Sequence, residues 1–321
     1  MFLALVAIAI VRIRDLFAVT MLSGIFSFLA AGLYMVLDAV DVSFTEAAVG
    51  AGVTTVFFLA TLRCSVRVEK AEHSPTRSNR WLALLPVLVT GAALIYGMSD
   101  APLLGDANAP AHGEVAQRYI QQGPVEVGVP NMVTAVLASY RGFDTLGETA
   151  VIFTAGMAVL LILGIQETPH NLLGRTANDH HLVLRVVTKT LLPFILMFAL
   201  YVQFHGDYGA GGGFQAGVIF ATGFILYDLV FGGADSRQVI PSRSLVFGAA
   251  FGVFLYGGVG VYSVFKGRSF LDYSVLAKDP IAAQHLGILL IELGIGITVF
   301  SVLLLIFFSL SGKRCLPCLK P

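Results

Sequence analysis

Charged residues are scarce in this chain. Asp, Glu, Lys and Arg together make up 12% of its 321 residues, whereas soluble domains carry roughly 25%. Hydrophobic residues make up 56%. So few charges cannot cover a water-facing surface, which excludes a soluble enzyme and predicts an integral membrane protein.

The net charge is zero, and the cysteine content is low. The 20 basic residues balance the 20 acidic ones, so nothing indicates nucleic-acid binding. Three cysteines cannot form a disulfide framework. Cys315 and Cys318 form a CxxC that could bind metal or cycle redox state, but a basic cytosolic tail holding two thiols is the simpler interpretation. With no catalytic triad, phosphate loop or metal-ligand cluster in the sequence, we expect neither enzymatic activity nor a cofactor.

Long apolar runs are abundant instead. A helix needs about 20 mostly apolar residues to cross the hydrocarbon core. Eight windows qualify: 16–37, 44–62, 81–98, 146–165, 182–204, 214–231, 245–265 and 286–310. A ninth, 1–11, lacks the marks of a signal peptide and is either a short tilted span or a span whose start is missing. The sequence therefore predicts an all-α, polytopic membrane helix bundle of about nine spans.

The distribution of basic residues predicts the orientation. With the N-terminus outside, 15 of the 20 Lys and Arg residues lie toward the cytoplasm. The C-terminus is then cytoplasmic, and 99–144 is a long outer loop. Within it, 131–140 has polar and apolar residues at helical spacing and is expected to lie along the interface.

Ionisable residues inside predicted spans are functional candidates, because a charge in hydrocarbon is costly. Glu292 is the strongest, since so short a side chain hardly reaches water from seven residues into its span. His285 lies on nearly the same helical face. Glu46 lies one turn before Gly50, so its carboxylate would face bare backbone. Asp228, near the inner end of its span, is a weaker candidate.

Structural interpretations of some of these residues stay open. Asp41 could cap a helix start, and Glu46 could be a first-turn acid favoured by the helix dipole. Lys189 is either a buried proton carrier or a side chain that extends to the cytoplasmic interface. Asp144 lies at a helix start with Glu148 placed like the acid of a capping box.

The stretch FHGDYGAGGGFQAGVIF, residues 204–220, places polar residues and glycines before an apolar run. Gly211, Gly212 and Gly213 end a polar turn and begin a helix, where glycine permits a sharp turn and close packing. The first N–H groups of that helix present partial positive charge beside His205 and Asp207. Either this is a tight packed hairpin, or it is a polar patch at the outer mouth of an ion path or a docking surface.

The sequence of this stretch resembles the B-type component (MrpB, MnhB) of Mrp-type multisubunit Na⁺/H⁺ antiporters, and the resemblance covers about 180–310. The usual pattern has proline where Ala210 stands and histidine where Asp207 stands. Residues 1–70, with DVSFTEAAVG, look like the D-type component of membrane-bound hydrogenases. Residues 81–167, with YRGFDTLGETAVIF, look like the E-type component, and 311–321 would be a cytoplasmic tail.

This resemblance implies a subunit of a monovalent cation/proton antiporter in the bacterial inner membrane. It implies large A- and D-like and small C-, E-, F- and G-like partner subunits, surrounding lipid, and Na⁺ and H⁺ as transported ions. The implied proton or ion pathway comprises Asp41, Glu46, Glu148, Lys189, His205, Asp228 and Glu292. Implied docking residues are Gly211, Gly212, Gly213, Phe214 and Gln215 in the turn, together with Arg141 and Asp144. The alternatives are a purely structural subunit and a membrane subunit of an energy-converting hydrogenase or complex I-like redox complex.

Overall fold

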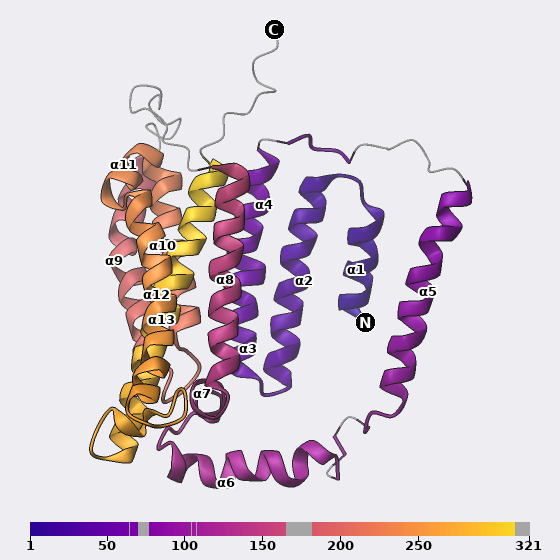
Figure 1. Cartoon of the computed structure of the whole chain (residues 1–321). Helices are drawn as coiled ribbons and strands as arrows, with labels where there is room; N and C mark the ends of the chain where they lie inside the picture. Colours follow the sequence, from indigo (N-terminus) through magenta and orange to yellow (C-terminus); the bar gives the residue numbers. More distant parts are fainter. Residues whose placement is uncertain (64, 70–76, 104, 107, 165–181, 312–321) are drawn as a thin grey trace.

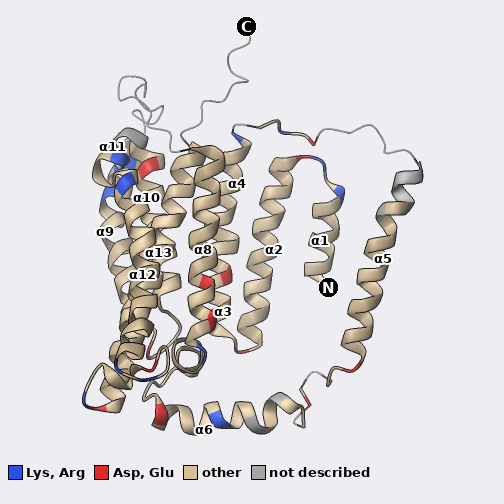
Figure 2. Cartoon of the chain, in the orientation of Figure 1, with Lys and Arg blue, Asp and Glu red and all other residues tan. Residues whose placement is uncertain are grey.

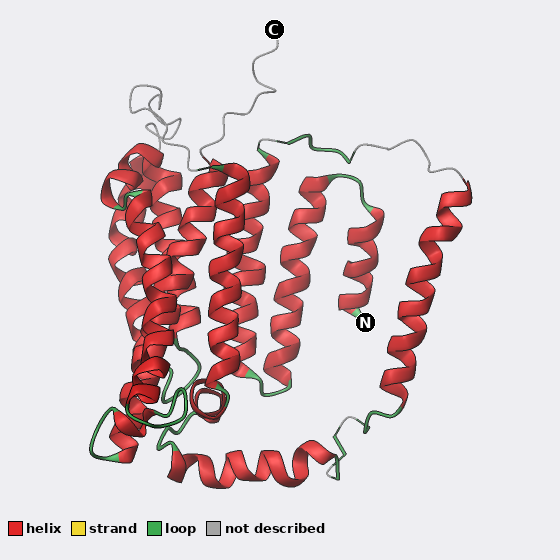
Figure 3. Ribbon diagram, in the orientation of Figure 1, coloured by secondary structure: helices red, strands yellow, loops and turns green. Residues whose placement is uncertain are grey.

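The computed structural model describes residues 1–63, 65–69, 77–103, 105–106, 108–164 and 182–311. Helices run through this part of the chain, and it contains no strand (Figure 3). The linker 167–181 and the terminal Cys315 and Cys318 lie outside the described residues. The predicted all-α class is confirmed.

Seven helical segments are long and apolar enough to cross a membrane. They are α2 (Leu16–Val36), the continuous segment Val40–Leu62, α8 (Gly142–Leu163), α9 (Leu182–His205), α10 (Gly213–Phe231), α12 (Ser242–Phe265) and α13 (Pro280–Ser311). Two shorter apolar stretches are α1 (Phe2–Arg12) and the Leu84–Ser99 part of α5 (Arg77–Ser99). Each predicted window coincides with one of these nine segments to within a few residues at its ends, and the number that cross the membrane stays a prediction.

The segment Val40–Leu62 changes its winding along its length. It starts as α3 (Val40–Thr45), continues as the π-helix η1 (Glu46–Val53) and ends as α4 (Thr54–Leu62). Wider π-helical turns are rare and occur frequently at functional sites. Two further π-helices are η2 (Ala111–Val115), which precedes α6 (Ala116–Glu126), and η3 (Ala135–Tyr140), which leads into α8.

The core of the bundle is α13, which packs against α8, α10 and α12 (Figure 1). Glycines permit these close approaches, as in other membrane helix pairs. A Cβ at Gly217 of α10 would lie 2.7 Å from the carbonyl oxygen of Gly296. A Cβ at Gly294 would lie 2.7 Å from the carbonyl oxygen of Gly252 on α12.

The N-terminal helices are more open. In Figure 1, α5 stands apart from the other long helices, and α6 (Ala116–Glu126) runs crosswise from it toward the rest of the bundle. Apolar side chains such as Val87, Leu88 and Ile95 on α5 are exposed. Such a surface suits lipid or neighbouring membrane helices.

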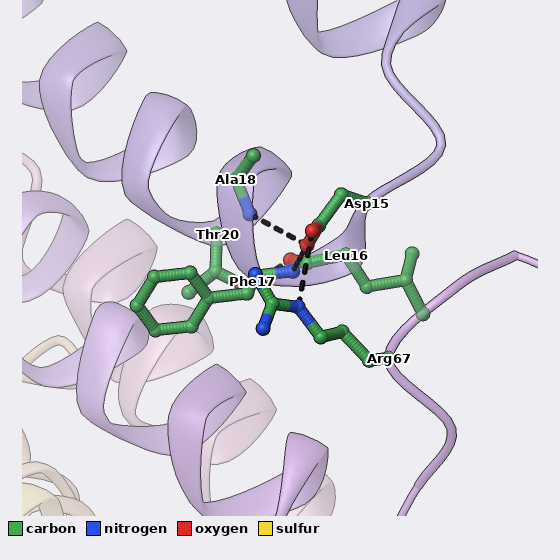
Figure 4. A network of polar contacts seen from close by, with 6 residues as sticks. All are labelled: Asp15, Leu16, Phe17, Ala18, Thr20 and Arg67. Carbon is green, nitrogen blue, oxygen red and sulfur yellow. Dashed lines mark hydrogen bonds and ion pairs between the residues drawn. The ribbon is translucent and has the colours of Figure 1, made fainter.

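The start of α2 is fixed by a polar network around Asp15 (Figure 4). The carboxylate of Asp15 accepts hydrogen bonds from the backbone N–H groups of Phe17 (2.9 Å) and Ala18 (3.2 Å). The Nε of Arg67 lies 3.0 Å from the same carboxylate. This N-cap ties the α1–α2 turn to the segment after α4, because Leu16 also donates to the carbonyl oxygen of Arg67 at 2.9 Å.

Charge is distributed unevenly between the two ends of the bundle. Figure 2 shows basic residues near α11 (Gly233–Val239) and the α1–α2 turn, at the end opposite α6. We call these the basic end and the α6 end. The α6 end also carries α7 (Met132–Thr134), the turn 206–212 and the loop 266–279. The predicted outer loop 99–144 therefore lies across one end of the bundle, and its outward orientation stays a prediction.

Candidate functional site

A cavity of about 400 Å³ lies toward the α6 end. Three regions far apart in the sequence line it: α3; α7, η3 and α8; and the turn before α10 together with the start of α10 and α13. Each contributes one carboxyl group, from Asp41, Glu148 and Glu292 respectively. Hydroxyl and amide groups complete the polar lining, on Thr45, Thr134, Thr145, Thr149 and Gln215. We call this the carboxylate cavity.

Glu292 is the most enclosed of the three acids. Its side chain belongs to the α13 core, and the residue is only 8% exposed. Two glycines make room for the carboxyl group, because a Cβ at Gly206 or Gly212 would lie 3.1 Å from its Oε1. Among the described residues, none forms a hydrogen bond with this carboxyl group. Glu292 therefore presents to the cavity an acid group without a fixed partner.

Asp41 connects α3 to the glycine-rich turn. Its Oδ1 accepts a hydrogen bond from the backbone N–H of Gly211 at 3.2 Å. Next to it, Gln215 donates through Nε2 to the hydroxyl of Thr45 at 2.9 Å. The interpretation of Asp41 as a helix cap is wrong, because Ala39 is the N-cap residue and no side chain caps that end. The carboxylate is held instead by a turn 170 positions away.

The glycine-rich turn, residues 206–213, is tightly constrained. Gly212 has a φ of +117°, which favours glycine, and a Cβ at Gly213 would overlap the backbone carbonyl of Glu292. The Nδ2 of Asn131 donates to the carbonyl oxygens of Gly206 (3.0 Å) and Gly209 (2.9 Å). The predicted packed hairpin is thus present, and it places α10 directly against Glu292.

Asn131 and Thr134 clamp this turn, a contact that no pattern in the sequence predicted. Asn131 caps α7, and Thr134 donates through its hydroxyl to Gly206 O at 2.7 Å. Both residues lie more than 70 positions before the turn, in a segment predicted only to lie along the interface. An asparagine directly before a helical pattern was the one local signal, and it indicates a helix start rather than a contact.

His205 is the last residue of α9 and lies next to the turn, where a Cβ at Gly209 would lie 2.9 Å from its Nε2. His205 stacks on Tyr201, with ring centroids 4.8 Å apart, and it does not line the carboxylate cavity. Asp207 pairs instead with His285, whose Nδ1 lies 3.0 Å from the Asp207 Oδ2. Asp207 stands where the related B-type sequences usually have a histidine, and here it is paired with a histidine from the start of α13.

Three other predicted pathway residues lie outside the cavity lining. Glu46 packs beside Gly50, as its spacing predicted, since a Cβ there would lie 2.6 Å from Glu46 Oε1. Lys189, for which a buried and an interfacial position were both left open, has an exposed side chain, and its Nζ lies 5.7 Å from the ring centre of Phe231. Asp228 is buried near the basic end, where it accepts a hydrogen bond from Ser236.

The motif YRGFDTLGE opens α8. Arg141 pairs with Asp144 at 2.5 Å, and both side chains are well exposed. Glu148 lines the cavity and is exposed. The expected capping box is not formed, because no side chain caps α8.

Tyrosine hydroxyls fix the segments around the α8 start. Tyr256 donates to the Gly142 carbonyl oxygen at 2.6 Å, and Tyr273 donates to that of Ala138 at 2.7 Å. Burial raises the pKa of Tyr273, so it stays a neutral donor. Tyr140 donates to Glu126 of α6, and burial together with this acid raises the pKa of Tyr140 to about 12.

Comparison with known families divides the chain into three parts. Residues 183–305 match the family described as "Domain related to MnhB subunit of Na+/H+ antiporter". Residues 1–66 match MbhD and residues 91–173 match MbhE, two families of MBH components. A protein of Staphylococcus haemolyticus (strain JCSC1435), named as antiporter subunit mnhB2, is 37% identical over 142 residues, which are 43% of this chain and 99% of that protein. Its counterpart in Staphylococcus aureus (strain Newman) is 34% identical over 140 residues, with the same coverage.

Two solved structures share the fold. One chain of the Mrp complex from Dietzia sp. DQ12-45-1b superposes with a TM-score of 0.73 at 24% identity, over 96% of this chain. Our chain spans only 34% of that longer chain. A chain of the membrane-bound sulfane sulfur reductase, an archaeal respiratory complex, matches with a TM-score of 0.53 and 30% identity, over 72% of this chain and 97% of its own length. Because the match to the mnhB2 proteins spans almost their whole length, this chain belongs to the MnhB family of antiporter subunits, with MbhD- and MbhE-related segments preceding its MnhB part.

Proposed function

We propose that this chain is a membrane subunit of a multisubunit Na⁺/H⁺ antiporter and that the carboxylate cavity is a station on its proton or cation path. The observation that carries this proposal is Glu292, a buried acid without a hydrogen-bond partner among the described residues, which shares one cavity with Asp41 and Glu148. The family membership supports the same function.

The cavity has the chemistry that such a station requires. Neighbouring carboxyl groups titrate as a coupled set, so a proton or cation on one changes the affinity of the others. Moving one elementary charge through the membrane field exchanges about 2.3 kcal/mol per 100 mV. A pKa change of one unit corresponds to about 1.4 kcal/mol. The free-energy changes of a few coupled acids are therefore similar in size to the energy that the membrane potential supplies.

The proposal also concerns how the chain is organised. We infer three modules, 1–70, 81–167 and 180–310, which each contribute one carboxyl group to the cavity. A site shared in this way would form only when the modules pack together. The chain would act beside the other subunits of an Mrp-type complex in the cell membrane of a bacterium, moving ions rather than catalysing a chemical reaction.

A second function is favoured by one specific observation. The chain matches a sulfane sulfur reductase chain and carries MbhD- and MbhE-related segments. Both features favour a role as a membrane subunit of a respiratory redox complex. The cavity would then move ions driven by redox chemistry in other subunits. Neighbouring genes for hydrophilic iron–sulfur subunits would favour this function over the antiporter.

The test measures Na⁺-driven and Li⁺-driven proton exchange in everted vesicles that carry the whole complex. Glu292→Gln keeps the shape of the side chain and removes its ionisation, so exchange should be lost while the complex still co-purifies. Asp272→Asn is the matched control. It removes one charge at the same end of the molecule, and asparagine preserves the hydrogen bond that Asp272 accepts from the Ser274 backbone N–H. Full exchange in an assembled Glu292→Gln complex would refute the proposal.

A further inference from the structure

The threonine hydroxyls that line the carboxylate cavity all donate their protons to backbone carbonyl oxygens. These residues are Thr45, Thr134, Thr145 and Thr149, and their donor–acceptor distances lie between 2.7 and 2.9 Å. A hydroxyl group has one proton to donate, so these four can offer the cavity only acceptor oxygens. The lining therefore combines carboxyl groups with further oxygen acceptors.

Thr45 also fixes the orientation of the Gln215 amide. Its proton goes to the backbone carbonyl of Asp41, so Thr45 Oγ1 must accept the 2.9 Å hydrogen bond that joins it to Gln215. The amide nitrogen of Gln215 therefore faces Thr45, and Oε1 points in another direction. Gln215 is only 8% exposed, and no described residue donates a hydrogen bond to its Oε1. Like Glu292, it is a buried acceptor without a fixed partner.

The free oxygens of Gln215 and Glu292 meet at the glycine-rich turn. A Cβ at Gly212 would lie 3.1 Å from Glu292 Oε1 and 3.6 Å from Gln215 Oε1. Asp41 reaches the same turn, because its Oδ1 accepts the hydrogen bond from the Gly211 N–H. One amide oxygen and two carboxyl groups are thus gathered at one end of the cavity. Oxygen acceptors placed so close repel one another unless a proton donor or a cation lies between them.

The charge of the lining favours a cation. Three carboxyl groups line the cavity, and the described residues of its wall include no Lys, Arg or His. The start of α10 adds partial positive charge, but a helix N-terminus is equivalent to only about half an elementary charge. Hard cations bind to carboxylate, carbonyl and water oxygens. The volume of about 400 Å³ leaves room for the water molecules that complete a coordination shell.

We propose that Glu292, Gln215 and Asp41 form a binding site for a small monovalent cation, Na⁺ or Li⁺. This site deepens the proposed function, on which it rests, by naming the cation and its ligands. Gln215 is the informative ligand, because a neutral amide oxygen binds a cation but does not take up a proton. Its loss should weaken cation binding without removing a titratable group.

Carbodiimide labelling tests the site at Glu292 itself. Dicyclohexylcarbodiimide reacts with protonated carboxyl groups, so a cation that replaces the proton protects the group. The purified complete complex is treated with this reagent in NaCl, LiCl or choline chloride at equal ionic strength, and mass spectrometry measures the modification of Glu292. We expect Na⁺ and Li⁺ to slow this modification at least tenfold relative to choline. Equal rates in Na⁺ and choline would overturn the proposal.

Two glutamine variants then test the ligand. Gln215→Leu removes the amide oxygen at nearly constant volume and should raise the Na⁺ concentration needed for half-protection by about tenfold or more. Gln203→Leu is the matched control, because it makes the same change at a buried glutamine of α9 that does not line the cavity. Half-protection of Gln215→Leu at the concentration found for the Gln203→Leu complex would contradict the assignment.

A count of bound radioactive Na⁺ does not depend on carbodiimide reactivity. In equilibrium dialysis, the Glu292→Gln complex should hold one Na⁺ fewer than the unmodified complex, and an equal count would overturn the proposal. Both measurements report binding and not transport. Na⁺ protection in a complex that does not exchange Na⁺ for H⁺ would therefore refute the proposed function alone. Exchange that Glu292→Gln abolishes, without Na⁺ protection of Glu292, would overturn the cation site alone.

Discussion

Gly217→Ala tests whether the α10–α13 contact holds the carboxylate cavity in shape. A Cβ at this position would lie 2.7 Å from the carbonyl oxygen of Gly296 and 3.0 Å from Val299 Cβ. Ordinary contact begins at 3.4 Å, so α10 must retreat from α13 by about 0.7 Å. A gap of this size forfeits a quarter to a half of the attraction at each contact, and overpacking of this kind costs about 1–3 kcal/mol.

The same displacement would carry Gly213 away from Glu292, so stability and transport should fall together. The assay heats the detergent-purified complex and follows the intact fraction by size-exclusion chromatography, with Na⁺/H⁺ exchange measured in vesicles. We expect the temperature at which half of the complex remains intact to fall by several degrees. Gly257→Ala is the control, because nothing lies within 4 Å of its Cβ and alanine favours a helix by about 0.5–1 kcal/mol. A Gly217→Ala complex as stable as the Gly257→Ala complex would refute the close approach.

Three further predictions concern the ends of the bundle. Because the pKa of Tyr140 is raised to about 12, its hydrogen bond to Glu126 should hold below pH 10 and be lost as the pH rises toward 12. Amide hydrogen exchange in α6 should therefore increase over that pH range. Tyr140→Phe, which lacks the hydroxyl, should show the faster exchange at all pH values. The backbone N–H of Ala18 is the main cause of a lowered pKa at Asp15, so its cap should persist in mild acid and be lost as the pH falls through that lowered value. Asp15→Ala should speed tryptic cleavage near the start of α2, whereas Asp15→Asn should not. Asn131→Ala removes two hydrogen bonds to the glycine-rich turn, worth about 1–3 kcal/mol together, and should speed amide exchange there about tenfold. Asn131→Asp, which keeps the α7 cap but loses both donors, should match it, and an unchanged rate in either variant would show that the clamp is not formed.

Packing faces could not be predicted from the sequence. A helix in a membrane is apolar both where it meets lipid and where it meets another helix, so periodicity does not distinguish the two faces. Lys189 was therefore open to either interpretation, and the structure exposes it. Glu292 was identified because its depth in an apolar run is a local property, although its neighbours were not.

The sequence by itself determined that the chain folds in a membrane, where its long helices lie and where its glycine-rich turn lies. Each of these features depends on residues within about 20 positions of one another. Only the tertiary structure brought Asp41, Glu148 and Glu292 to one cavity and paired Asp207 with His285. The physical reason is that these groups lie 78 or more positions apart, so their meeting depends on which apolar helices pack against which. Backbone contacts between glycines and neighbouring helices decide that packing here, and no local pattern records it.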